Sequence, residues 1–437
     1  MNKIEKIITI FFSILIITSY FFGFFFQENS IGSGGYNGDL VWMWKNFEIF
    51  KNENLLQAIK SDDFFGNRTA LLYIINIYLN PFINDIENYR LSITIFSLSA
   101  SYILFLCIKE KFNNINFEII LLFSLIVLLS PFYRTSSFWG MEIQYGIISS
   151  LLSILFFFKS NKLEKASYSN IFLSIIFSSA TVYFDLKLII IPIFIYLKIL
   201  FSNLDNKMKI FSSISYFLFA IPYFLLILLW NGIVPIATQQ SNPLQITHLI
   251  NSKFHMVNIL FATNILGFYL MPFLILKKNL FKSFKNILNV FNLIILFLFV
   301  VYLFYFINAG LYDFVDRVPR ETGGYKDFWG LGYSAKLSNI LFDTRAFSII
   351  FNVIVYLVST LIIILFINSN YINFFLILFF FILSIALFPL MQEYFDPYIY
   401  IISLLLAKNE YDFNFSKCIG IFLYYSFFLI SSIIYYS

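Results

Sequence analysis

Long apolar runs recur from one end of the chain to the other, and they limit its possible folds more than any other feature. About 60% of the residues are hydrophobic and only 12% are charged. An apolar run of about 18 residues or more has the length that a helix needs to cross a bilayer. The pattern therefore predicts an all-α, polytopic membrane protein.

Thirteen apolar runs can be counted, ten of them at least 18 residues long, so we expect about 11–13 transmembrane helices. They lie at residues 6–26, 91–109, 116–131, 142–159, 170–183, 186–203, 210–230, 257–276, 287–307, 346–367, 371–390, 394–407 and 418–436. The first run has no small-residue cleavage site after it, which favours a retained helix over a signal peptide. No internal repeat or Gly/Ser linker interrupts the chain, so one transmembrane domain, residues 1–437, is the simplest organisation.

The distribution of basic residues predicts the orientation. If the N-terminus lies inside, more than half of the 29 lysines and arginines fall on short inner segments, as the positive-inside rule requires. Two long outer segments then remain, residues 27–90 and 308–345. The many Ile, Phe, Asn and Lys residues are typical of AT-rich bacterial genomes. We therefore expect an integral protein of the bacterial inner (plasma) membrane with a cytoplasmic N-terminus.

The head of the first outer segment combines glycines, one carboxylate and two tryptophans. Gly34-Gly35-Tyr36-Asn37-Gly38-Asp39 is followed by Leu40-Val41-Trp42-Met43-Trp44. Glycines free the backbone, and tryptophans favour the lipid headgroup region. Our hypothesis is that Asp39 is held at the bilayer surface, at the tip of a loop, as a catalytic base; the alternative is that it is an ordinary solvated surface acid, like the other acids of this segment. Behind it we expect short interfacial helices at residues 41–50, 55–60 and 69–82.

Other ionisable residues gather at the predicted outer ends of the spans. Ionisable groups at a membrane boundary are costly unless they are paired or functional. Two interpretations stay open for the turn 130–142: substrate binding, or a structural ion pair of Arg134 with Glu142. Asp185 and Lys187 are likewise either functional or simply polar turn residues. The loop 308–345 contributes three arginines: Arg317, Arg320 and Arg345.

Metal and nucleic-acid sites are not expected from the sequence. Cys107 and Cys418 form no disulfide framework, and His248 and His255 are too few for a metal site. No nucleotide-binding fingerprint is present, and the formal charge of +5 includes no basic cluster for nucleic acid. No cofactor is therefore expected, although a role for a divalent cation stays open.

The order of these motifs resembles the GT-C superfamily of integral-membrane glycosyltransferases, which use polyprenyl-phosphate-linked sugars. The acidic residue after the first helix corresponds to Asp39. Further motifs follow over roughly the first 200 residues, and more loosely beyond them. They are Leu71-Leu72-Tyr73, Arg90-Leu91, the Ser130-Pro131 turn with Arg134 and Glu142, Ile191-Pro192-Ile193-Phe194-Ile195-Tyr196, and Glu393-Tyr394-Phe395-Asp396-Pro397.

The resemblance implies transfer of a hexose or pentose from a lipid-linked donor to a lipid, glycan or protein acceptor, with inversion at the sugar carbon. A carboxylate, Asp39, would take the proton of the acceptor hydroxyl. Arginines would hold the leaving phosphate, because the guanidinium fork matches phosphate oxygens. The substrate-binding residues expected on this basis are Arg134, Glu142, Arg317, Arg320, Arg345, Tyr36 and Trp42. The expected partners are the lipid-linked donor and membrane lipids.

Two rival classes remain, and a non-enzymatic membrane scaffold is a further alternative. An oligosaccharide-repeat polymerase or ligase would usually rely on arginines in two late loops, whereas here the first loop is the elaborate one. A lipid-linked glycan flippase or other transporter predicts ionisable or Gly/Pro-broken positions at mid-bilayer, and the spans here carry almost no charge in their centres.

Overall fold

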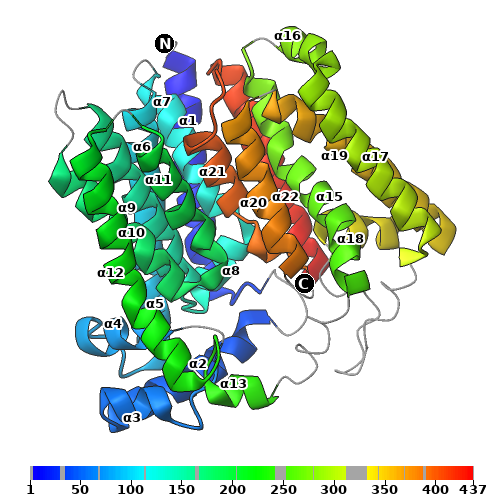
Figure 1. Cartoon of the computed structure of the whole chain (residues 1–437). Coiled ribbons are helices and arrows are strands. Elements are labelled where there is room, and N and C mark those ends of the chain that lie inside the picture. Colours follow the sequence, from blue (N-terminus) through cyan, green and yellow to red (C-terminus); the bar gives the residue numbers. More distant parts are fainter. Residues whose placement is uncertain are drawn as a thin grey trace. The chain divides into compact units, whose positions relative to one another are not determined.

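The computed structural model is built of helices, which turns and loops connect (Figure 1). It describes residues 3–29, 35–66, 69–112, 115–162, 167–202, 204–241, 252–278, 280–311, 332–342, 344–368, 370–386 and 390–436. Within these ranges no β-strand forms, and one isolated β-bridge joins Lys277 to Tyr411. The predicted fold class, an all-α polytopic membrane protein, is confirmed.

The chain divides into two compact units. Unit 1 comprises Met1–Pro243 and Phe422–Ser437, and unit 2 comprises Leu244–Ile421. The expectation of a single transmembrane domain stays a prediction.

Unit 1 is a helical bundle in which α9 and α10 pack most extensively, with α6 and α12 beside them. Its helices are α1 (Lys3–Phe25), α2 (Gly35–Asn52), α3 (Leu55–Lys60), α4 (Leu71–Leu79), α5 (Ile86–Ser97), α6 (Ser99–Lys111), α7 (Phe117–Leu125), η1 (Ile126–Leu129), α8 (Pro131–Phe138), α9 (Ile143–Lys162), α10 (Tyr168–Phe184), η2 (Leu186–Ile189), α11 (Ile190–Leu200), α12 (Asn206–Trp230) and α13 (Ile236–Ser241). The last helix of the chain, α22 (Phe415–Tyr436), enters this unit at Phe422.

Unit 2 is organised around α15, which packs against α18, α19, α20 and α21. Its helices are α15 (Ser252–Leu276), α16 (Leu280–Lys285), η3 (Asn286–Leu288), α17 (Val290–Asn308), α18 (Gly332–Leu341), α19 (Arg345–Ile367), α20 (Tyr371–Ala386), η5 (Gln392–Tyr394) and α21 (Tyr398–Leu405). Every residue of α21 is buried, so this short helix belongs to the interior of the unit.

Eight described helices are long and apolar enough to cross a bilayer, and a bent pair could supply a ninth span. The eight are α1, the stretch Ile86–Lys111 formed by α5 and α6, α9, α12, α15, α17, α19 and α22. The bent pair joins Phe117–Leu129 to Pro131–Phe138 at an angle of 65°. The bend follows from local chemistry, because the Ser130 hydroxyl caps α8 by accepting from the Tyr133 N–H and Pro131 occupies its first turn.

The remaining predicted spans are helical but shorter than 18 residues: α10, α11, α20 and α21. A helix rises about 1.5 Å per residue, so α10 extends about 25 Å, less than the roughly 30 Å hydrocarbon core. Length and composition thus give eight or nine spans in the described residues, against the 11–13 expected. A continuous apolar sequence occurs both in a short helix buried inside the protein and in a helix that crosses the whole bilayer, so the sequence does not distinguish them.

Residues 27–90, predicted to lie outside the membrane, carry three helices at one end of the unit 1 bundle. Figure 1 shows α2, α3, α4 and α13 gathered there. The Trp230 indole N–H at the end of α12 donates to the Ile59 carbonyl at 3.0 Å. The Thr238 hydroxyl on α13 accepts from the Gly66 N–H at 2.8 Å and donates to the Gly66 carbonyl at 2.9 Å. We call α2–α4 and α13 the cap.

Three of the cap helices, α2, α3 and α4, were predicted, whereas α13 was not. Helix α3 spans the predicted residues, and α4 is shorter than the predicted 69–82. Helix α2, predicted over 41–50, begins at Gly35, so Asp39 lies within a helix and not at a loop tip. Each glycine costs a helix about 1 kcal/mol relative to alanine. The buried apolar stripe farther along α2 offsets that cost.

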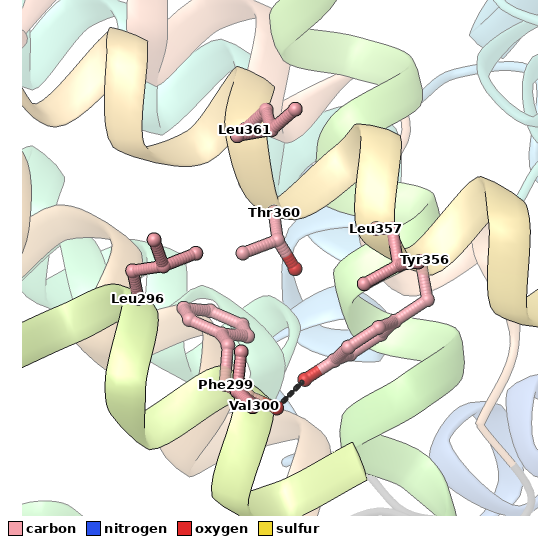
Figure 2. A pocket seen from close by; sticks show the side chains of 7 residues that line it. All are labelled: Leu296, Phe299, Val300, Tyr356, Leu357, Thr360 and Leu361. Atoms are coloured by element: carbon pink, nitrogen blue, oxygen red, sulfur yellow. Dashed lines mark hydrogen bonds between the residues drawn. The ribbon is translucent and has the colours of Figure 1, made fainter. Parts of the chain in front are cut away.

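A small apolar cavity lies between α17 and α19 in unit 2. Its volume is about 130 Å³, and Leu296, Phe299, Val300, Tyr356, Leu357, Thr360 and Leu361 line it (Figure 2). The Tyr356 hydroxyl donates to the Phe299 carbonyl at 2.8 Å and so ties the two helices together. No charged side chain lines this cavity, so it offers no acid or base.

The buried position of Lys277 should make the stability of the fold depend on pH. It follows α15, is largely buried, and its ammonium donates to the Leu365 carbonyl near the end of α19. Burial lowers the pKa of Lys277 to about 8, from 10.5 when exposed. Between these two values the unfolded chain binds more protons, so the stability of the fold rises with pH over that window. Thermal unfolding in detergent should show this rise in the wild type, and Lys277→Met should reduce it; equal slopes would contradict the assignment.

Candidate functional site

Helix α2 presents Asp39 to solvent and its apolar face to the rest of unit 1. Leu40, Met43, Phe47 and Phe50 are buried, and their spacing of three or four residues puts them on one side of the helix. Asp39 is exposed. The predicted carboxylate is therefore carried by a helix whose position is fixed by packing.

An aromatic core fixes α2 to its neighbours. The Phe47 ring centroid lies 5.1 Å from that of Tyr73 on α4 and 5.2 Å from that of Tyr89 on α5. Asn46 adds polar contacts, since its amide donates to the Phe65 carbonyl at 2.6 Å and to the Tyr73 hydroxyl at 2.8 Å. The cap is thus a packed layer joined to a membrane helix.

Trp42 and Tyr36 were predicted to bind substrate. The Trp42 side chain is 52% exposed, its ring centroid lies 5.4 Å from that of Phe65, and the Lys45 ammonium stands 4.4 Å over its ring. Trp42 is thus available on the cap surface. The Tyr36 side chain lies outside the described residues.

Helix α8 is short, rich in hydroxyl groups and wholly buried. The Tyr133 hydroxyl donates to the Ser97 carbonyl at 2.6 Å. Tyr20 of α1 forms hydrogen bonds with the Ser97 and Ser137 hydroxyls. Three helices therefore meet in one hydrogen-bonded network, and α8 holds its side chains in fixed positions.

Arg134 of α8 forms an ion pair with Glu28, a partner that the sequence did not predict. Its Nε and Nη2 donate to the two Glu28 oxygens at 3.1 and 2.7 Å. Its Nη2 and Nη1 also donate to the Ser19 carbonyl and hydroxyl, at 2.9 and 3.2 Å. The side chains of Arg134 and Glu28 are 2% and 9% exposed. The ion pair considered between Arg134 and Glu142 is not formed, because Glu28, just after α1, occupies the bidentate position.

Glu142 lies directly after a turn that is closed by Tyr89. The Tyr89 hydroxyl donates to the Gly140 carbonyl at 2.6 Å. Gly140 has a φ of +70°, and a Cβ there would stand 2.5 Å from the Tyr89 ring, so the turn requires glycine. Glu142 itself is buried. Since the Trp44 and Tyr89 ring centroids are 5.8 Å apart, α2 lies against the same tyrosine that closes this turn.

Arg90, part of the predicted Arg90-Leu91 motif, is a second buried arginine at this end of unit 1. Its Nε donates to the Phe138 carbonyl at 2.8 Å, and its Nη1 donates to both Glu87 oxygens at 2.8 and 2.9 Å. Its guanidinium carbon stands 4.1 Å from the Trp139 ring centroid. The signal in the sequence was a charged residue directly before the predicted span 91–109.

Asp185 and Lys187 form a local turn structure. Asp185 caps η2 by accepting from the Lys187 N–H at 3.0 Å, and the two side chains approach to 3.4 Å. These contacts favour the interpretation as polar turn residues.

The structure does not describe the side chains of the three arginines predicted to bind substrate in unit 2. Arg317 and Arg320 lie outside the described residues, and Arg345 begins α19 with a side chain that is also outside them. Among the described residues, no three His, Cys, Asp or Glu side chains are grouped so that they could hold a metal ion.

The structure thus brings together Arg134, Glu28, Arg90 and the turn leading to Glu142, beneath a cap that carries Asp39 and Trp42. The catalytic and substrate-binding roles of the predicted residues stay predictions. No protein-family model matches this chain, and no curated protein or solved structure matches it either.

Proposed function

We propose that this protein is an integral-membrane glycosyltransferase that moves a hexose or pentose from a polyprenyl-phosphate donor to an acceptor at the outer face. The observation that carries the proposal is the cap. An exposed carboxylate, Asp39, is carried on a helix that packs against Tyr89, the chain neighbour of the buried Arg90. A donor that is half in lipid needs a site of this kind, with polar groups at headgroup level.

The chemistry requires a base and a cation. The acceptor hydroxyl oxygen forms a bond to the anomeric carbon while Asp39 takes its proton. The bond from that carbon to the phosphate oxygen breaks, and its electron pair leaves on the phosphate. Direct displacement inverts the sugar carbon. A guanidinium at headgroup level stabilises the charge that develops on the leaving phosphate.

The phosphate partners proposed from the sequence are Arg134, Arg317, Arg320 and Arg345. The four hydrogen bonds of Arg134 to Glu28 and Ser19 leave it little capacity for a ligand. We therefore do not assign the phosphate role to Arg134, and the roles of Arg317, Arg320 and Arg345 stay predictions.

A transfer assay tests the proposal. Purified protein in nanodiscs is supplied with a panel of polyprenyl-phosphate hexoses and pentoses and a membrane extract as acceptor source. Release of polyprenyl phosphate that depends on the protein supports transfer. If no donor is consumed while intact donor crosses the bilayer of proteoliposomes, the flippase alternative replaces the proposal.

The proposed orientation, with the cap outside and the N-terminus in the cytoplasm, makes a labelling prediction. Cysteine at Asp62, exposed in the cap, should react with a membrane-impermeant maleimide in intact cells. Cysteine at Lys207, exposed at the opposite end of α12, should react only after the cells are opened. The native Cys107 and Cys418 are buried and provide a low background. The reverse labelling pattern would place the cap, and with it Asp39, in the cytoplasm.

A further inference from the structure

Arg90 is a buried arginine whose hydrogen bonds are incomplete. It is 2% exposed, and its Nη2 has no acceptor within the described residues. A buried donor without an acceptor costs about 1–3 kcal/mol, and buried polar groups are seldom left unpaired. The Nη2 group therefore has hydrogen-bonding capacity for a ligand.

The other contacts of Arg90 hold its guanidinium in place. The Nε–H bond to the Phe138 carbonyl fixes one edge. The guanidinium carbon lies 4.1 Å from the Trp139 ring centroid and 5.3 Å from that of Phe24. Trp139 is itself anchored, because its indole N–H donates to the Glu28 carbonyl at 3.1 Å. A guanidinium held this way loses little freedom when it binds an anion.

The remaining partner, Glu87, is removable. Its side chain is 63% exposed, in contrast to that of Arg90. Both of its oxygens contact Nη1, at 2.8 and 2.9 Å, so it does not span the two terminal nitrogens as a carboxylate does in the strong fork geometry. An anion with several oxygens could take that edge, with one oxygen on Nη1 and another on Nη2.

The position of Arg90 along its helix indicates which anion this is. It lies in the second turn of the candidate span Ile86–Lys111, at the end that carries the cap. The end of a span is the level at which lipid phosphate groups lie. A phosphate that is attached to a hydrocarbon chain meets Arg90 there without leaving the bilayer.

We propose that Arg90 is a phosphate-binding residue of this protein and that Glu87 is a stand-in partner that the phosphate of a polyprenyl-linked donor displaces. The inference rests on the proposed function, because it names the group that holds the donor phosphate in the same site. It goes beyond that proposal in giving Glu87 an inhibitory role.

Binding of undecaprenyl phosphate in nanodiscs, without sugar and without turnover, tests the inference. Glu87→Gln removes the competing charge, so affinity should rise about three- to tenfold, the range expected when one exposed charged partner is lost. Arg90→Lys keeps the charge and loses the fork, so affinity should fall about tenfold or more. Glu53→Gln, an exposed acid of the same segment, is the matched control and should change affinity little.

A purely structural Arg90–Glu87 pair gives a different result. Glu87→Gln would then lower thermal stability without raising affinity, and that outcome overturns the inference. Because Glu87 is exposed, this variant should fold even if Arg90→Lys does not. Inorganic phosphate and phosphatidylglycerol nanodiscs serve as the other probes. If either responds to Glu87→Gln as strongly as undecaprenyl phosphate does, the lipid-linked donor is rejected as the ligand.

Failure of this inference can be told apart from failure of the proposed function. If the protein binds undecaprenyl phosphate through Arg90 but consumes no lipid-linked sugar, the phosphate site is supported and the transferase proposal is rejected. If the protein transfers sugar but neither Glu87→Gln nor Arg90→Lys changes its affinity for the lipid, the proposed function is supported and the phosphate site at Arg90 is rejected.

Discussion

Asp39→Asn should lower sugar transfer by about 10²-fold or more, because asparagine keeps the size of the side chain but cannot accept the acceptor proton. The carboxylate is exposed on α2, so the substitution should change the free energy of unfolding by no more than about 0.5 kcal/mol. Affinity for the lipid-linked donor should stay unchanged, since the carboxylate acts on the acceptor. Turnover, thermal unfolding and donor binding measured on the same preparation separate these effects.

Other acids of the first segment provide matched controls for Asp39. Glu48 lies on the exposed side of the same helix, and Glu53, Asp62 and Asp63 are exposed farther along the chain. The control variants are Glu48→Gln, Glu53→Gln, Asp62→Asn and Asp63→Asn. If Asp39→Asn reduces transfer no more than these four variants do, Asp39 is an ordinary surface residue. The site would then have to be sought among the polar groups around Arg90 and the turn before Glu142.

The helices were predictable because their signal is local. An apolar run of sufficient length, or a stripe such as Leu40, Met43, Phe47 and Phe50, appears in the sequence wherever a helix buries one face. The limits of α2 were less predictable. Its first turn contains Gly35 and Gly38, which local propensity would place in a loop, and only packing of the later stripe makes a helix stable there.

The partners within the site were not predictable in the same way. Arg134 and Glu142 are near each other in sequence, which suggested a pair, yet the partner is Glu28, 106 positions away. Nothing in the sequence marks Glu28 as more than an acid at the end of a span. The incomplete hydrogen bonding of Arg90 is likewise a property of the packed structure, since it depends on where the Phe138 carbonyl and the Trp139 ring come to lie.

Arg134→Ala should destabilise the fold by about 3–5 kcal/mol, the usual cost of leaving one partner of a buried ion pair uncompensated. Glu28 would keep its charge in a buried position, and the two bonds that join α8 to Ser19 of α1 would be lost. Arg134→Lys should recover only part of the loss, because an ammonium cannot form the bidentate contact. The monodisperse fraction after heating in detergent measures the effect.

A double-mutant cycle separates this structural role from the substrate-binding role first expected of Arg134. Combining Arg134→Met with Glu28→Gln removes both charges, so the double variant should be more stable than Arg134→Met alone. Undecaprenyl phosphate binding in the double variant should remain close to that of the wild type if Arg90 is the phosphate ligand. If Arg134→Ala instead keeps its stability and loses lipid binding, the phosphate belongs to Arg134. Its pairing with Glu28 would then be the contact that the donor replaces.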